Sequence, residues 1–304
     1  MNLFLIILFS LLNLSVGRAC NISENELLIR IAMMKATETR LSQMSLTSRE
    51  KQDYGDAVNI SKKEFLRIID RVKKIYVPIF RDLEMNFKIE HLWEDKQQNA
   101  FAGMSGTDRF ILLYGGYARQ KLMTPDAYLS IVCHEIGHHL GGFPRKMNST
   151  WSSSEGQADY FSTLKCMKEV LQRDPQNSPL ADALDLPEQI KTQCRSQFSD
   201  KDQYNICLRS SKAAEDYGKV IANILVPGSE RKISLMTPAD ELTFVTNLRH
   251  PTAQCRADTK FQGALCNVSP LISLDDEDET IGTCNLSDFN ILGNRPACWF
   301  VHRK

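Results

Sequence analysis

Apolar positions recur at helical spacing along much of the chain. In residues 23–41 and again in residues 61–83, apolar side chains return every three or four positions, which predicts two amphipathic helices. Ser61 stands at the start of the second stretch and is a residue type that commonly caps helices. Helices are also predicted at three later stretches, which are residues 186–198, 204–225 and 238–248. These patterns indicate a mainly helical chain.

A region between these helices has the features of strands and a turn. Polar and apolar residues alternate over residues 87–93, which predicts a strand. Residues 102–108 are rich in glycine and small polar side chains, as a hairpin turn would be, and the apolar residues 110–114 follow as its second strand. The sequence therefore predicts an α+β fold that is mainly α-helical, with a small antiparallel sheet.

The chain begins with an almost unbroken apolar run from Leu3 to Val16. The run is too short to cross a bilayer and is typical of a signal-peptide core, so we predict a signal peptide at residues 1–19. Cleavage after Ala19 would leave Cys20 first, and a lipid anchor on Cys20 is the minor alternative to plain secretion. No later stretch has about 18 uncharged apolar residues, so no transmembrane segment is expected. We predict an exported protein, periplasmic or extracellular.

The most informative stretch covers residues 131–166. It contains the sequence HEIGH, an HExxH motif at residues 134–138. On a helix, His134 and His138 lie about 40° apart around the axis, so both rings project from one face and can reach a common zinc ion. Glu135 lies roughly a quarter turn away, where it can act as a general base without binding the metal.

A catalytic zinc site needs three protein ligands and an open position, so a third ligand is expected nearby. Glu155 is the candidate, because glycines end the first helix and a serine-rich loop can cap a second helix that begins at Glu155. Asp159 follows one turn later on the same face, where it can accept the remaining N–H of a ligand histidine. We predict one catalytic zinc ion bound by His134, His138 and Glu155.

The sequence HEIGHHL followed by EGQAD resembles the HExxH…ExxAD pattern of the gluzincin metallopeptidases, specifically the family of the CAAX prenyl protease and the heat-shock and periplasmic quality-control proteases. Residues 99–114 resemble the family's edge strand, and residues 250–256 resemble its HP-x4-R element. The resemblance implies a zincin-type metallopeptidase domain over residues 20–304. Its catalytic core would cover residues 95–260, and a cysteine-containing cap would cover residues 261–304.

The resemblance also implies roles for residues outside the two zinc motifs. In relatives, the histidine that matches His250 lies near the metal, so here it would stabilise the oxyanion or block the zinc in a latent form. Tyr160 is an alternative donor to the oxyanion, and Arg256 would orient the element that carries His250. An edge strand beside the zinc helix would let an extended peptide add itself through main-chain hydrogen bonds. The residues assigned to this substrate-binding strand are Asn99, Ala100, Phe101 and Ala102.

These residues predict an exported zinc-dependent endopeptidase that hydrolyses peptide bonds of extended or unfolded proteins. A zinc-activated water would attack the carbonyl, with Glu135 as the general base. Two other classes stay open: a zinc-containing peptide-binding or chaperone-like protein without turnover, and a metallohydrolase with a small substrate.

The charge of the chain bears on its partners. The 37 basic and 37 acidic side chains balance, so we expect a protein or peptide substrate and no nucleic acid. The acidic run at residues 275–279 is predicted to be a solvated loop.

Nine cysteines in an exported chain predict disulfides, and the odd number leaves one cysteine over. Cys194 and Cys207 flank the turn between two predicted helices and could bridge it. Cys133 lies in an apolar helix and is predicted to be the free, buried thiol.

The C-terminal cysteines have fewer possible partners. If residues 251–265 form one helix, Cys255 and Cys266 lie about 16 Å apart, which is too far for a bond. Each must then pair elsewhere. Cys284 and Cys298 are candidates that would staple the C-terminal part to this helix.

Overall fold

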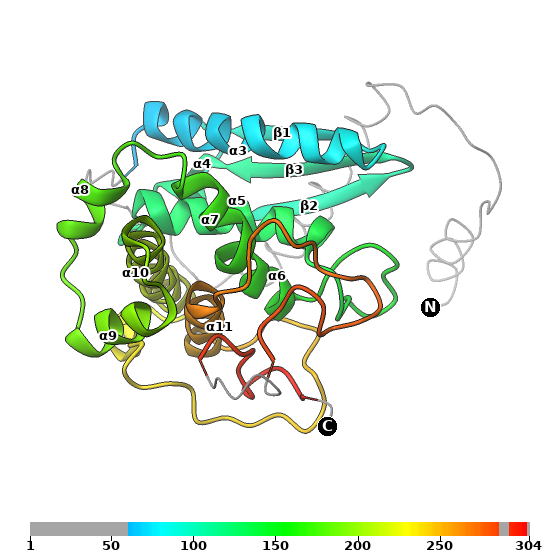
Figure 1. Cartoon of the computed structure of the whole chain (residues 1–304). Coiled ribbons are helices and arrows are strands. Elements are labelled where there is room, and N and C mark those ends of the chain that lie inside the picture. Colours follow the sequence, from blue (N-terminus) through cyan, green and yellow to red (C-terminus); the bar gives the residue numbers. More distant parts are fainter. Residues whose placement is uncertain (1–59, 286–291, 303–304) are drawn as a thin grey trace, which may run out of the picture. The chain divides into compact units, whose positions relative to one another are not determined.

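The computed structural model describes residues 60–285 and 292–302 of the chain (Figure 1). The predicted signal peptide, the predicted helix at residues 23–41 and Cys20 lie outside these residues. Within them, no helix is long and apolar enough to cross a membrane. The architecture is mainly helical with one small sheet, which confirms the predicted α+β class.

The first described helix, α3 (Lys62–Asp82), forms where the apolar spacing predicts it. The hydroxyl of Ser61 accepts a hydrogen bond from the N–H of Glu64 at 3.2 Å, so Ser61 is the N-cap. This helix packs on strand β1 (Asn86–Leu92) and on helix α5 (Pro125–Leu140). Its buried face consists of Phe65, Ile68, Ile69, Val72, Tyr76 and Phe80.

The sheet contains β1, β2 (Ala100–Ser105) and β3 (Asp108–Tyr114), in the order β1-β3-β2. The predicted hairpin is present, because β2 and β3 pair antiparallel. The strand β2 extends into the predicted turn, which shrinks to Gly106 and Thr107, with Gly106 at φ 60°. The structure adds a parallel pairing of β1 with β3, so the sheet is mixed.

The remaining helices follow the sheet along the chain. They are α4 (Gly115–Ala118), α5, α6 (Glu155–Phe161), a π-helical turn (Ser162–Cys166), α7 (Met167–Leu171), α8 (Asn177–Asp182), α9 (Glu188–Gln197), α10 (Lys201–Leu225), a 3-10 turn (Ser229–Lys232) and α11 (Ala253–Leu265). The pair α9 and α10 confirms the helices predicted at residues 186–198 and 204–225.

The prediction of a helix at residues 238–248 is wrong, because these residues form an extended loop. The N–H groups of Thr243 and Asn247 donate to the carbonyls of Ala297 and Trp299, at 2.9 and 2.7 Å. Pairing with the C-terminal segment thus replaces intrahelical hydrogen bonds. The apolar side chains whose spacing suggested a helix are exposed: Leu242, Phe244 and Val245.

The two largest of four apolar clusters form most of the core of the described residues. The larger cluster joins α3, the sheet, α5, α7 and α10, and the other joins α9, α10 and α11. Helix α10 packs on both α5 and α11 and therefore contributes to both clusters. Because α5 is covered by α3, the sheet and α10, its side chains from Ala127 to His138 are all buried (Figure 1).

Two disulfides lie within the helical part. Cys194–Cys207 joins α9 to α10 and confirms the predicted bridge. Cys133 is bonded to Cys166, so the prediction of a free thiol at Cys133 is wrong. Helix α5 packs on the π-helical turn, which brings the Cα atoms of these two cysteines to 5.4 Å. Their wide separation along the chain gives no sign of this contact.

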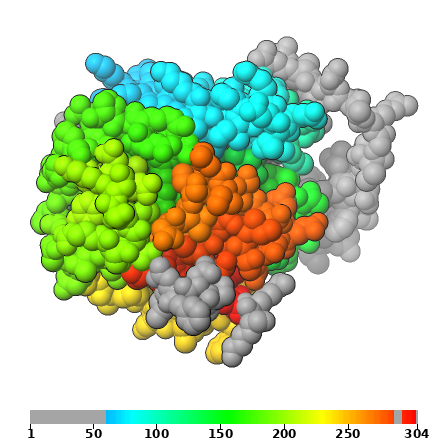
Figure 2. All heavy atoms as spheres, in the orientation of Figure 1, coloured from blue at the N-terminus to red at the C-terminus, as the bar shows by residue number. Residues whose placement is uncertain are grey.

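Two further disulfides, Cys255–Cys298 and Cys266–Cys284, attach the C-terminal part to α11, as expected. The stretch after α11 is coloured orange in Figure 2 and lies on the face of the molecule seen there, beside the green helices.

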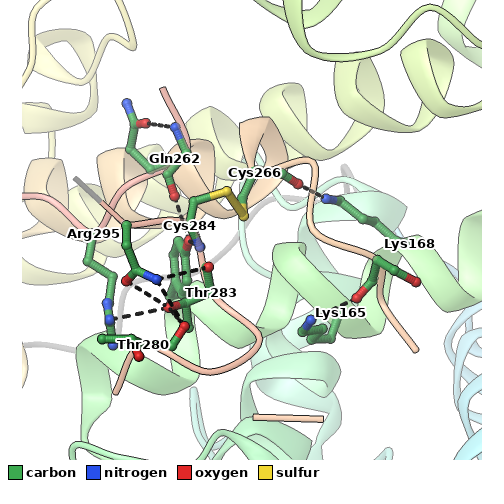
Figure 3. The surroundings of a disulfide bond; sticks show 12 residues. Lys165, Lys168, Gln262, Cys266, Thr280, Thr283, Cys284 and Arg295 are labelled. Atoms are coloured by element: carbon green, nitrogen blue, oxygen red, sulfur yellow. Dashed lines mark hydrogen bonds between the residues drawn. A yellow bond between two sulfur atoms is a disulfide. The ribbon is translucent and has the colours of Figure 1, made fainter. Parts of the chain in front are cut away.

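Two buried lysines support the chain next to the Cys266–Cys284 bond (Figure 3). The ammonium of Lys168 donates to the carbonyl of Cys266, and that of Lys165 donates to the carbonyl of Ser269 at 2.9 Å. Burial lowers the pKa of Lys168 to about 7 and that of Lys165 to about 8. No carboxylate is bonded to either ammonium among the described residues.

Lys168 should make the stability of the fold depend on pH. Burial lowers its folded-state pKa to about 7, whereas a lysine of the unfolded chain titrates near about 10.4. Between these values the unfolded chain binds more protons, so the free energy of unfolding rises with pH by up to about 1.4 kcal/mol per pH unit for this group. We expect Lys168→Met to reduce this slope by about one proton, measured by urea unfolding between about pH 7 and 10. An unchanged slope in the variant would contradict the lowered pKa of Lys168.

Candidate metal centre

Helix α5 carries both histidines of the HExxH motif, and its start is held firmly. The hydroxyl of Thr124 accepts from the N–H of Ala127 at 3.3 Å, and Pro125 is the first helical residue, as predicted. Arg209 of α10 donates two hydrogen bonds to the carboxylate of Asp126, at 2.8 and 2.7 Å. These contacts fix the direction of the helix that presents the motif.

The loop between α5 and α6 turns the chain back so that α6 begins beside the motif. The N–H of Ser153 donates to the carbonyl of His138, and its carbonyl accepts from Nδ1 of the same histidine, both at 2.9 Å. This contact leaves Nε2 of His138 free to bind a metal. Ser154 is then the N-cap of α6, and Glu155 is its first residue, as predicted. The role of Ser153 was not predicted, because it acts through its main chain.

His134, His138 and Glu155 each offer a ligand atom, and these atoms all lie within 4.8 Å of one another. Nε2 of His134 lies 3.2 Å from Oε2 of Glu155, and Nε2 of His138 lies 3.7 Å from Oε1. Ligands of a tetrahedral zinc ion lie roughly 3.4 Å apart, so the spacing fits. Oε2 of Glu155 is buried, and the nearby imidazole nitrogens of His134 and His250 lack the geometry of a hydrogen bond to it. Two imidazoles and a carboxylate are a donor set of catalytic zinc.

Besides Arg256, whose Nη2 lies 3.9 Å from Oε2, two cationic or polar side chains reach Glu155 from other parts of the fold. Nζ of Lys146 lies 2.7 Å from Oε1, and Nε2 of His250 lies 3.1 Å from Oε2. Burial would raise the pKa of Glu155, but its contacts with His134 and His250 hold that pKa well below its usual range. The side chain of His250 is 68 % exposed, so it stands on the solvent side of the cluster. Lys146 was not predicted, since no motif marks it.

Asp159 is fully buried and joins the motif helix to α11. Its Oδ1 accepts from Nδ1 of His134 at 2.8 Å, and its Oδ2 accepts from Nε of Arg256 at 2.6 Å. Lys260 lies 3.0 Å from Oδ1. Burial would raise the pKa of Asp159, but Arg256 and Lys260 hold it well below its usual range. The structure thus brings Asp159 and Arg256 together. Lys260 was missed, although it lies one helical turn beyond Arg256.

Glu135 is buried beside the ligands, with 5 % of its surface exposed. Burial raises the pKa of its carboxyl group to about 7. A carboxyl group with a pKa near neutral can accept a proton and return it at the same pH, as a general base must.

The residues expected to bind substrate lie at and before β2. Ala100, Phe101 and Ala102 belong to the strand, and Asn99 precedes it. β2 packs against α5 and lies at the edge of the described sheet, because β3 separates it from β1. Tyr160, the alternative oxyanion donor, is engaged elsewhere, since its hydroxyl donates to the carbonyl of Gly293 at 2.5 Å.

Residues 62–184 match the model of peptidase family M48, and the match contains His134, His138 and Glu155. This stretch is a peptidase family M48 domain. No curated protein and no solved structure matches the chain. The M48 domain begins with α3, before the predicted start of the core at residue 95, and ends after α8. Helices α9 to α11 and the C-terminal segment lie beyond it.

A second buried ion network ties the M48 domain to α10 at some distance along α5 from the candidate metal ligands. Arg209 is 2 % exposed and lies 3.0 Å from Asp174, which also lies 3.2 Å from Arg71. The carboxylate of Asp174 contacts none of the three candidate ligands. Asp174, like Asp159, is therefore a buried carboxylate paired with cations, but it lies away from the candidate ligands.

Asp159→Asn should weaken both the fold and zinc binding. The change leaves Arg256 and Lys260 buried without a full counter-charge, which costs about 3–5 kcal/mol in comparable cases. Loss of the carboxylate partner of His134 should lower zinc affinity about 10- to 100-fold. Urea unfolding and competition with a chromogenic chelator measure the two effects.

Asp174→Asn is the matched control. It should destabilise the fold by less, because Asp126 still pairs with Arg209, and it should leave zinc affinity unchanged. Equal zinc affinities in the two variants would contradict the role assigned to Asp159.

Proposed function

We propose that the protein is an exported zinc endopeptidase that cleaves extended or unfolded protein chains. The observation that carries this proposal is the convergence of His134, His138 and Glu155, with the buried Glu135 beside them, inside an M48 domain. A pure binding site would have no need of a buried carboxyl group at the general-base position of the HExxH motif, next to the candidate ligands.

In this proposal His134, His138 and Glu155 hold one zinc ion. Bound zinc would polarise the peptide carbonyl and lower the pKa of water towards about 7. Glu135 accepts the proton of the attacking water and delivers it to the leaving amine nitrogen. His250 donates a hydrogen bond to the developing oxyanion, a contribution of about 3–4 kcal/mol for a well-placed donor. Its exposed ring and its contact with Glu155 support this role.

An extended substrate would bind along β2. The strand lies at the edge of the described sheet and packs on the motif helix. Main-chain pairing with residues 99–102 would hold a peptide beside the metal while reading little of its sequence. This mode favours unfolded or extended chains over compact ones, and over small esters or amides.

Export is supported by the disulfides and by the apolar run near the start of the chain. Eight cysteines form four disulfides in the described residues, which is typical of an oxidising compartment. The apolar run at residues 3–16 suits a signal peptide. A periplasmic or extracellular location follows, with a lipid on Cys20 as the minor alternative.

Glu135→Gln should retain zinc but lose turnover. The amide preserves the shape of the side chain and cannot take the proton, so we expect casein cleavage to fall by about 10²- to 10⁴-fold. Zinc content is measured alongside, by metal analysis of the purified protein.

Glu169→Gln is a control within the M48 domain, because Glu169 is also buried but pairs with Arg173 rather than with the ligands. It should cleave casein at the wild-type rate. Full activity of Glu135→Gln would reject the assigned base. Zinc binding by the wild type without cleavage would favour the chaperone-like alternative, and cleavage of small amides alone would favour the small-substrate hydrolase.

Removal of zinc should lower the stability of the wild-type protein. A ligand that binds only the folded state at about 100 times its Kd adds about 2.7 kcal/mol to the free energy of unfolding. We expect a chelator to lower Tm and added zinc to restore it. Glu155→Gln should abolish this response, and a zinc-dependent Tm in that variant would contradict the ligand set.

A further inference from the structure

The C-terminal segment, residues 292–302, packs directly on the helix that carries Glu155. The ring of Trp299 is fully buried against Gly156, the residue that follows Glu155. A Cβ atom added to Gly156 would lie 2.3 Å from this ring, so only glycine allows the contact. Trp299 therefore packs directly on the first turn of α6.

Polar contacts extend this packing along α6. Arg295 donates to the side-chain oxygen of Gln157 at 3.2 Å, and the hydroxyl of Tyr160 donates to the carbonyl of Gly293 at 2.5 Å. The same hydroxyl accepts from the N–H of Cys284 at 3.3 Å (Figure 3 shows the surroundings of this cysteine). The C-terminal part of the chain thus contacts both turns of α6.

The same segment reaches the other side of the ligand cluster. The carbonyl of Trp299 accepts from the N–H of Asn247 at 2.7 Å, in the loop that leads to His250. Its neighbour Cys298 is bonded to Cys255, which precedes Arg256, the partner of Asp159. One short stretch therefore contacts α6, α11 and the loop of His250.

We propose that residues 292–302 are a positioning clamp for the metal centre, with Trp299 and the Cys255–Cys298 bond as its two fastenings. The clamp rests on the proposed function, because it presumes that His134, His138 and Glu155 bind zinc. It goes beyond that function by giving a role to a segment outside the M48 match.

Physical reasons favour such a clamp. Helix α6 has no side-chain cap on its first turn, and it continues through the π-helical turn into α7. Most of the stability of a helix in a protein comes from packing, so packing contributes to the orientation of this first turn. A metal ligand needs to be held within about 0.5 Å of its place by the residues around it. The ring of Trp299 packs on Gly156, the residue next to Glu155, and can contribute to this support.

The test measures zinc affinity by competition with a chromogenic chelator, at a temperature where every variant is folded by circular dichroism. Trp299→Ala removes the ring and should weaken zinc binding about 10- to 100-fold, as loss of support around a ligand does. Trp299→Phe should weaken it less, because Nε1 of Trp299 has no hydrogen-bond partner among the described residues and only ring area is lost.

The disulfides supply a matched pair of variants. Cys255→Ser with Cys298→Ser unfastens the clamp and should weaken zinc binding about 10-fold. Cys194→Ser with Cys207→Ser also removes one disulfide but touches only α9 and α10, so it should change zinc affinity less than about twofold. Equal losses in the two pairs would overturn the clamp.

A double-mutant cycle tests the contact itself. Gly156→Ala should weaken zinc binding in the wild type, because its methyl group displaces Trp299 or α6. In the Trp299→Ala background the same change should have little further effect, since the space is free. Additive losses would overturn the role of Trp299. If the wild type binds no zinc, the proposed function fails, whereas wild-type affinity in all clamp variants refutes the clamp alone.

Discussion

The geometry of the candidate metal centre depends on one buried carboxylate, that of Asp159. A carboxylate without contact to water is tolerated only when cations and hydrogen-bond donors surround it. Arg256 and Lys260 of α11 supply the positive charge, and His134 supplies an N–H. The same interaction therefore balances charge in the core and fixes the ring of a ligand. Helix α11 lies outside the M48 match, yet the matched motif cannot be charge-balanced without it.

A second constraint acts through the loop between α5 and α6. Ser153 binds His138 through its main chain, and this loop is in turn held by the acidic stretch that was expected only to face solvent. The carbonyl of Asp275 accepts from the N–H of Phe143 at 2.9 Å, and Asp276 lies 2.7 Å from Arg145. The acidic stretch is exposed for the most part, but its first two residues contact the loop that leads into α6.

The M48 domain thus provides the chemical groups, and the rest of the described chain determines how firmly they are held. The positions of the disulfides follow the same division between the M48 domain and the rest of the described chain. Cys133–Cys166 joins the motif helix to the π-helical turn after α6, inside the domain, while the two C-terminal bonds attach segments from outside it. Disulfides persist in an oxidising compartment. They lower the conformational entropy of the unfolded chain and so stabilise the folded state.

The sequence by itself predicted the cluster of His134, His138 and Glu155 that could hold a metal ion, the capped start of α5 and the helices at α3, α9 and α10. Each of these features depends on residue types at short, fixed spacing along the chain. Helix geometry places residues at such a spacing on one face of the helix or at its capped end. Only the tertiary structure decided the bond of Cys133, the extended course of residues 238–248 and the contacts of Lys146, Ser153 and Lys260 with the centre. These features depend on which surfaces meet after folding, and residues far apart in sequence carry no local pattern that reveals their contact.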